Sequence, residues 1–163
     1  MNSALWFTFG FALWVTLIGS AQAGIPSGLT KYKLKHVEDI SQVFAQAKDL
    51  GVTDAEIEVI SKAATAAIAS GAYTALSLDN KHPTYVLSFA GITASFESGK
   101  EVAVDYMNRS AKAVYNVEGN KITGKETLDN GSSVDVTITF DGADVSVART
   151  SKSVTLKVQL TQM

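Results

Sequence analysis

The stretch Ile92-Thr-Ala-Ser-Phe-Glu-Ser-Gly-Lys-Glu-Val-Ala-Val-Asp-Tyr106 decides the fold, because apolar residues occupy alternate positions on both sides of a Ser98-Gly99 turn. Alternation with a period of two is typical of strands with one buried face. The pattern extends outward from Leu76 to Leu160, with turn residues about every 8–12 positions. It predicts a β-meander that closes as a barrel or folds as a sandwich. Besides this stretch, strands are expected near residues 32–35, 76–78, 85–89, 113–117, 122–128, 134–140, 145–147 and 154–160.

Two helices are expected between the first strand and the rest of the meander. Asp39 can cap the first helix, and Gly51 ends it. Thr53-Asp-Ala-Glu56 is a capping box, in which the first and fourth side chains satisfy backbone donors reciprocally, and the helix it starts continues to about Ala69. The apolar residues of the first helix fall on one helical stripe and are Ile40, Val43, Phe44 and Ala47.

The first 23 residues have the pattern of a secretory signal peptide. An apolar run from Ala4 to Ile18 is followed by Ala21-Gln22-Ala23, which supplies the small residues of a cleavage site. The run is shorter than the roughly 20 apolar residues that span a bilayer. We therefore expect a signal peptide over 1–23 and one secreted, extracellular domain over 24–163 that is not stably inserted in a membrane.

Composition excludes several functions. The 163 residues include no cysteine, which removes disulfides, thiol catalysis and thiolate metal sites. A net charge of −2 argues against electrostatic capture of nucleic acid. His36 and His82 lie in separate segments, so neither is expected to bind a metal or to act in catalysis. The sequence contains no nucleophile elbow, phosphate loop or dinucleotide fingerprint. We expect no enzymatic activity and no cofactor.

Two triplets have the pattern of N-glycosylation acceptors in a secreted protein. They are Asn108-Arg109-Ser110 and Asn130-Gly131-Ser132. Asn-Gly is also a hairpin-turn dipeptide, which favours exposure of the second triplet. Asn108 and Asn130 are therefore candidate glycosylation sites.

This layout resembles the intracellular lipid-binding protein family, which includes the fatty-acid-binding and retinoid-binding proteins. The similarity runs from about Thr30 to Gln159. Its most specific part is 94–120, which resembles the family's run of Ser-Phe, Gly, an acidic residue before an apolar one, a polar turn, Lys and a strand closing in Gly. Leu50-Gly51-Val52 and Tyr32-Lys33-Leu34 resemble two further family segments. The resemblance implies a ten-stranded up-and-down antiparallel β-barrel, with the helix pair as a lid over a cavity for one hydrophobic small molecule.

The orientation of the last strands has two interpretations. The family anchors a ligand with an arginine on one late strand and Arg-x-Tyr on the last, and a gap-free alignment on Asp141-Gly142 places Thr137, Lys157 and Gln159 at these positions, pointing inward. The hydrophobic pattern points the other face inward, because a one-residue slip reverses every side chain of a strand. Exposing the aliphatic face would forfeit roughly 1.5–3 kcal/mol per residue. We favour the hydrophobic pattern, which lines the cavity with Val136, Ile138, Val147, Leu156 and Val158.

The remaining candidates concern ligand entry and ligand charge. Ile57 and Ile60 either pack the helix pair onto the barrel rim or form a portal for the ligand. Lys157 pairs with an acidic ligand head if it points inward and is solvated if it points outward. We expect a secreted, non-enzymatic carrier of one fatty acid, retinoid, carotenoid or similar molecule. The alternative is a structural or interaction protein whose barrel is packed shut and holds no stable ligand.

Overall fold

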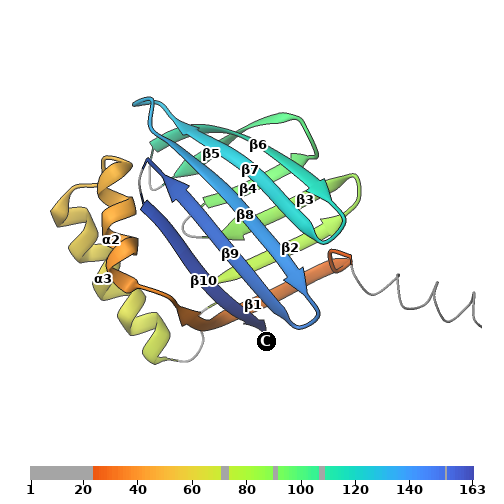
Figure 1. The fold of residues 1–163 in the computed structure, drawn as a ribbon, viewed down its shortest axis with the longest axis horizontal. Coiled ribbons are helices and arrows are strands. Elements are labelled where there is room, and N and C mark those ends of the chain that lie inside the picture. The colour runs from red at the N-terminus through yellow and green to blue at the C-terminus, as the bar shows by residue number, and fades with distance from the viewer. Residues whose placement is uncertain (1–23, 71–73, 90–91, 107–108, 153) are drawn as a thin grey trace, which may run out of the picture.

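The chain forms a closed antiparallel barrel of ten strands in the computed structural model, which describes residues 24–70, 74–89, 92–106, 109–152 and 154–163. Each strand pairs with its neighbours in sequence, and β1 closes the barrel against β10 (Figure 1). This confirms the up-and-down barrel and not the sandwich. The predicted signal peptide lies outside the described residues. The strands are β1 (Gly28–Val37), β2 (Leu76–Lys81), β3 (Thr84–Phe89), β4 (Ile92–Glu97), β5 (Glu101–Tyr106), β6 (Arg109–Glu118), β7 (Lys121–Leu128), β8 (Ser133–Asp141), β9 (Asp144–Ser151) and β10 (Val154–Gln162).

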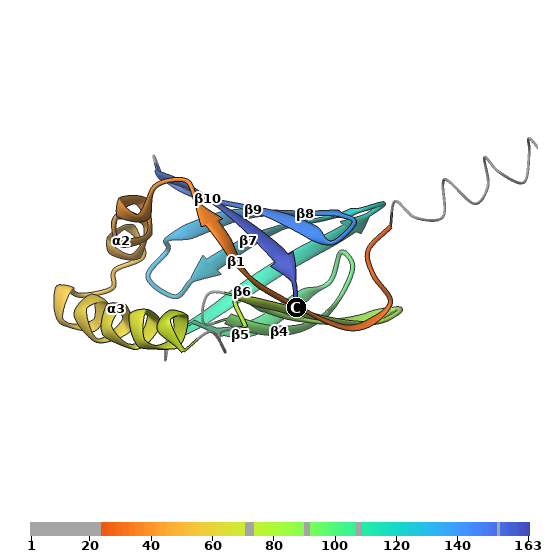
Figure 2. The same ribbon diagram turned by 90° about the horizontal axis from the view of Figure 1, so that it is seen from below.

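Two helices, α2 (Ile40–Asp49) and α3 (Asp54–Ala69), lie at one end of the barrel (Figure 2). Asp39 caps α2 by accepting a hydrogen bond from Ser41 N at 2.9 Å. Gly51 follows α2 with φ of 79°, a left-handed conformation that glycine adopts without strain. Helix α2 packs against β9, β10 and α3. In the described part of the chain, neither helix is long and apolar enough to cross a membrane.

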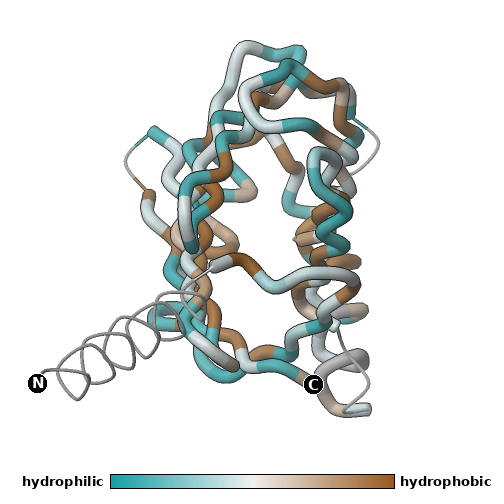
Figure 3. Tube along the Cα trace, turned by 90° about the vertical axis from the view of Figure 1, so that its right-hand side faces the viewer, coloured by the Kyte–Doolittle hydropathy of each residue, from teal (hydrophilic) through white to brown (hydrophobic). Residues whose placement is uncertain are grey.

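Side chains alternate between core and surface along the strands, and the tube in Figure 3 alternates between hydrophobic and hydrophilic accordingly. In β8, Val136 is 3% exposed and Ile138 is fully buried, whereas Thr137 between them is half-buried on the outer face. The inward residues of β9 and β10 include Val147, Leu156 and Val158, all of which are buried. The register favoured by the hydrophobic pattern is therefore the one that forms.

The gap-free alignment gave the wrong orientation for Thr137, Lys157 and Gln159. The side chain of Lys157 is 59% exposed, and its Nζ lies 3.4 Å from Glu38 Oε2. Gln159 is also exposed, and its Oε1 accepts a hydrogen bond from Ser146 Oγ at 3.1 Å. The physical reason is burial, since the opposite register would move Leu156 and Val158 into water.

Candidate functional site

The barrel interior contains a buried ion pair between Glu126 on β7 and Arg149 on β9. Arg149 Nη2 donates to Glu126 Oε2 at 2.6 Å, and the two side chains are only 2% and 5% exposed. Strand β8 lies between the two strands: its Val134 is opposite Glu126 and its Val136 is opposite Arg149. The charged side chains thus meet above the inner face of β8. A pair this deeply buried contributes little net stability, because desolvation offsets its attraction, so its position in the interior suggests a functional role.

Tyr115 on β6 completes this polar cluster. Its hydroxyl donates to Glu126 Oε1 at 2.9 Å, so each oxygen of Glu126 accepts a hydrogen bond. Burial, followed by the neighbouring Glu126 carboxylate, raises the pKa of Tyr115 well above its usual value of 10.0. The hydroxyl therefore stays protonated and remains a donor. We call Tyr115, Glu126 and Arg149 the polar centre.

Gly124 on β7 provides the space that the Tyr115 ring occupies. The two residues are paired across β6 and β7. A Cβ atom at position 124 would lie 2.3 Å from Tyr115 Cδ1, far inside van der Waals contact. Glycine at 124 therefore allows the ring to lie against the sheet with its hydroxyl at Glu126.

We expect Gly124→Ala to lower the free energy of unfolding by about 1–3 kcal/mol, because the new methyl group overpacks the core and displaces the tyrosine. Urea denaturation followed by far-ultraviolet circular dichroism would measure this change. The matched control is Gly142→Ala, at a turn glycine where a Cβ meets nothing within 4 Å and the only cost is a positive φ of 60°. Adding Tyr115→Leu to Gly124→Ala should recover part of the loss. A Gly124→Ala protein as stable as the parent would contradict the close packing.

The guanidinium of Arg149 lies between aromatic side chains. Its Cζ is 5.5 Å from the ring centre of Tyr106 and 5.9 Å from that of Phe89. Burial acts to lower the pKa of Arg149, but the charge of Glu126, the nearby Tyr106 and Tyr115, and the hydrogen bond to Glu126 together outweigh it. They hold that pKa above its usual value, so the side chain is a cation. Arg149 Nε is buried and has no hydrogen-bond partner among the described residues. The polar centre thus retains one unused donor.

A small cavity of about 10 Å³ lies beside the polar centre. This space has room for about one water molecule. Of the predicted cavity-lining residues, Val136 and Ile138 line this space, whereas Val147, Leu156 and Val158 are buried elsewhere in the core. Whether any of the five contacts a ligand stays a prediction. The complete lining is Leu87, Phe89, Ile92, Tyr115, Glu126, Val136 and Ile138.

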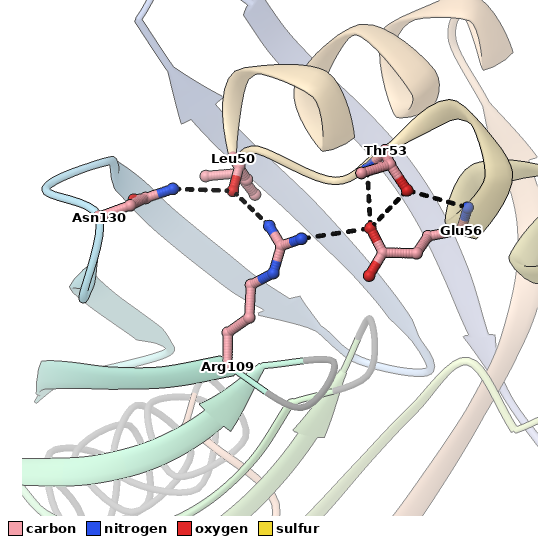
Figure 4. A network of polar contacts seen from close by, with 5 residues as sticks. All are labelled: Leu50, Thr53, Glu56, Arg109 and Asn130. Atoms are coloured by element: carbon pink, nitrogen blue, oxygen red, sulfur yellow. Dashed lines mark hydrogen bonds and ion pairs between the residues drawn. The ribbon is translucent and has the colours of Figure 1, made fainter.

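A set of hydrogen bonds, which we call the latch, fastens the helices to the barrel (Figure 4). Leu50 O, a carbonyl at the end of α2, accepts from Arg109 Nη1 at 3.1 Å and from Asn130 Nδ2 at 3.3 Å. Arg109 Nη2 also donates to Glu56 Oε2 at 3.2 Å. The same Glu56 oxygen accepts from Thr53 N and Thr53 Oγ1, both at 2.8 Å, which confirms the predicted capping box. The latch therefore joins both helices to two hairpins of the rim.

Three further contacts connect α2 to the barrel. Ser132 Oγ donates to Asp49 O at 3.3 Å, and Ser151 Oγ donates to Asp49 Oδ2 at 3.0 Å. The buried Gln46 Nε2 donates to the backbone carbonyl of Arg149 at 2.8 Å. Since the side chain of Arg149 belongs to the polar centre, this one residue of β9 connects helix α2 with the charged interior.

We expect Arg109→Met to raise the amide hydrogen exchange rates of residues 47–57 roughly 5- to 10-fold, because a hydrogen bond to Leu50 O worth about 1 kcal/mol is lost. Exchange measured by mass spectrometry would locate the effect. Lys112→Met, which removes a more exposed cation from the same strand, serves as the control. Equal exchange in both variants would show that the latch does not hold the helices.

Acid should also weaken the latch. Hydrogen bonds from Thr53, and then the charge of Arg109, hold the pKa of Glu56 below its usual 4.5. A group whose pKa falls on folding stabilises the fold above its unfolded pKa, and this contribution is lost as the pH falls through the folded value. The hydrogen-exchange protection factors at the start of α3 should therefore decrease in the parent protein when the pH is lowered below 4.5. Glu56→Gln should flatten this dependence, and a parent-like pH profile in that variant would contradict the assignment.

The other predicted residues lie as follows. Asn130 is in the turn between β7 and β8 and takes part in the latch, and Asn108 lies outside the described residues. Glycosylation of either stays a prediction. On α3, Ile57 is half-buried and Ile60 is 36% exposed, next to Val59 at 68%. Their role as a portal also stays a prediction.

A second hollow, of about 220 Å³, opens on the surface between β4 and β5. These strands pair only at Ile92 with Tyr106 and at Thr93 with Asp105, and they separate beyond that point. Glu97 and Lys100, which form an ion pair, lie in its wall. This hollow is open to solvent, whereas the polar centre is buried, so the polar centre is the stronger candidate site. No group of three or more His, Cys, Asp or Glu side chains that could hold a metal occurs within the described ranges.

No protein-family model and no curated protein sequence matches the chain. Solved structures do match. A Schistosoma mansoni fatty-acid-binding protein in complex with arachidonic acid is 16% identical with a TM-score of 0.59, covering 84% of this chain and 95% of that one. Human cRBP IV is 13% identical with a TM-score of 0.56, covering 84% and 97%. Secretory abundant heat soluble protein 4 of Ramazzottius varieornatus is 17% identical with a TM-score of 0.55, covering 84% and 94%. The chain therefore has the fold of the fatty-acid-binding proteins.

Proposed function

We propose that this protein is a non-enzymatic carrier that binds one hydrophobic small molecule inside its barrel and is secreted. The observation that carries the proposal is the polar centre, a buried cluster with an unused donor in an otherwise apolar interior. Apolar walls with a few convergent polar groups are the usual composition of a small-molecule site. The shared fold supports the same function, because the Schistosoma mansoni protein holds arachidonic acid. The sequence of residues 1–23 and the word secretory in the name of the Ramazzottius varieornatus protein support secretion.

Binding at the polar centre requires a change of shape. The cavity of about 10 Å³ beside it does not accommodate a lipid, so a ligand that occupies this position must separate side chains that are in contact without it. The latch is the natural place for the change, since its hydrogen bonds are few and lie at the rim. Residues lining the expanded space would come from the inward faces of β8, β9 and β10, and Ile57 and Ile60 would flank the entry. Since only the open form binds, the apparent affinity equals the intrinsic affinity multiplied by the fraction of protein that is open.

The small cavity also favours a second candidate function. A barrel filled by its own side chains is what a structural or interaction protein without a stable ligand requires. The two candidates differ in whether any apolar molecule raises the stability of the fold, because a ligand that binds only the folded state stabilises it.

The experiment uses the full chain secreted from a eukaryotic host. Mass spectrometry of an organic extract would identify a co-purified ligand, and displacement of the uncharged dye Nile red would measure binding of a panel of fatty acids, alcohols and retinoids. The carrier function predicts saturable binding of one molecule per chain together with a rise in Tm. No binding and no Tm shift across the panel would establish the second candidate. Recovery of the chain only inside the cells would contradict secretion without affecting the binding result.

A further inference from the structure

We propose that the ligand of this barrel is uncharged and presents one oxygen atom that accepts a hydrogen bond from Arg149 Nε. A long-chain alcohol, an aldehyde or an ester has this chemistry, and a free carboxylic acid does not. The inference rests on the proposed function and defines the class of its ligand.

The charges in the interior of the barrel balance each other. Within the described part of the chain, Glu126 and Arg149 are the two charged side chains in the core, and they neutralise each other at 2.6 Å. An uncharged ligand leaves this balance intact. A carboxylate adds a second negative charge to a desolvated space that holds a single positive one.

A ligand carboxylate at the polar centre would have to lie close to Glu126. Arg149 Nη2 is bound to Glu126, and the Tyr115 hydroxyl is also bound to Glu126. A ligand carboxylate at Nε would therefore stand beside the Glu126 carboxylate, and like charges in a dry interior repel strongly. Displacing Glu126 instead would leave that side chain buried, with neither of its present donors. Both routes penalise an acid.

The unused donor of Arg149 favours an uncharged acceptor. Arg149 Nε is buried and has no partner in the described residues, and such a group costs free energy until an acceptor arrives. An uncharged oxygen satisfies it without adding charge. The cavity of about 10 Å³ lies next to the guanidinium, since Phe89 lines the cavity and also contacts the guanidinium, and Glu126 and Tyr115 form another part of the wall.

The test compares acids and alcohols with the same hydrocarbon part. The probes are retinol against retinoic acid and decanol against decanoic acid, each displacing Nile red from the full chain at pH 7. We expect the parent protein to bind each alcohol at least about tenfold more tightly than the matching acid, because juxtaposed like charges cost several kcal/mol. Equal or tighter binding of the acids would overturn the proposal.

A variant tests the cause. In Glu126→Gln the charge of Arg149 is uncompensated, so the preference should reverse and the acids should bind more tightly than the alcohols. Glu38→Gln, which removes an exposed carboxylate on the outer face, should keep the preference of the parent. An unchanged preference in Glu126→Gln would overturn the assignment to the polar centre.

The design separates the two levels of the proposal. If the parent protein and both variants bind neither the acids nor the alcohols, the carrier function itself is contradicted. Binding of both classes without the expected preference contradicts only the ligand class. If Glu126→Gln fails to fold, the comparison of acids with their methyl esters on the parent protein still decides the point, since esterification removes the charge and keeps the acceptor oxygen.

Discussion

Replacing Glu126 with leucine is expected to lower the free energy of unfolding by about 3–5 kcal/mol, because the Arg149 guanidinium is then buried without its counter-charge. The variant also leaves the Tyr115 hydroxyl without its acceptor. Urea denaturation of the parent and variant, with m-values compared, measures the change.

The double replacement distinguishes a buried ion pair from ordinary packing. Arg149→Leu alone should also destabilise the fold, since it leaves Glu126 buried and unpaired. The variant carrying both Glu126→Leu and Arg149→Leu should lie within about 1–2 kcal/mol of the parent, because no charge then remains in the core. Additive losses in the double variant would mean that the two side chains are not coupled. A stable, ligand-free double variant would support a role of the pair in ligand binding rather than in stability.

A second large effect is expected on β8, where neighbouring residues lie on opposite faces. Ile138→Ala should cost about 2–5 kcal/mol, because Ile138 is fully buried and its truncation leaves a cavity in the core. Thr137→Ala, one residue away on the outer face, should change the stability by no more than about 0.5 kcal/mol. Thermal unfolding of the two variants side by side is sufficient.

These two variants test which of the two registers considered for β8 is correct, the one from the gap-free alignment or the one from the hydrophobic pattern. If Thr137→Ala were the costly change and Ile138→Ala the neutral one, strand β8 would be shifted by one residue and the ion pair could not form as described. Because the shift reverses every side chain of the strand, no intermediate result is expected.

Local signals in the sequence predict most of this fold. The Thr53–Glu56 capping box forms as expected, and Gly51 ends the first helical segment in the left-handed conformation. Such signals depend on residues within one turn of each other, so the sequence displays them directly. The alternation of β8 also predicted its buried face correctly, because the burial of four aliphatic and aromatic side chains is a larger energy than any single polar preference.

The polar centre was missed for a physical reason. Glu126 and Arg149 are 23 residues apart, and they meet only after β7, β8 and β9 have paired in one register. A signal existed: Arg149 has the same parity as the buried Val145 and Val147. The alternation of buried residues on β9, continued two residues beyond Val147, places the charged side chain of Arg149 inside the barrel. Thr137, Lys157 and Gln159, at the positions of the family's polar anchor in a gap-free alignment, lie on the outer faces of β8 and β10, whereas the buried arginine of this chain is on β9.

The position of Asn130 in the latch links a covalent modification to the lid. Its Nδ2 donates to Leu50 O and lies so near Gly51 that a Cβ there would be 3.0 Å away. N-glycosylation modifies this same nitrogen, and Ser132 of the acceptor triplet is bound to Asp49 O. A glycan at Asn130 would replace one of the two Nδ2 hydrogens and place a sugar next to Gly51 and Leu50 O, so it would crowd the latch. If the chain is secreted and Asn130 is glycosylated only in part, glycosylated and unmodified chains would differ in how the helices are held. A lectin column would separate them, and hydrogen exchange at residues 47–57 would distinguish them.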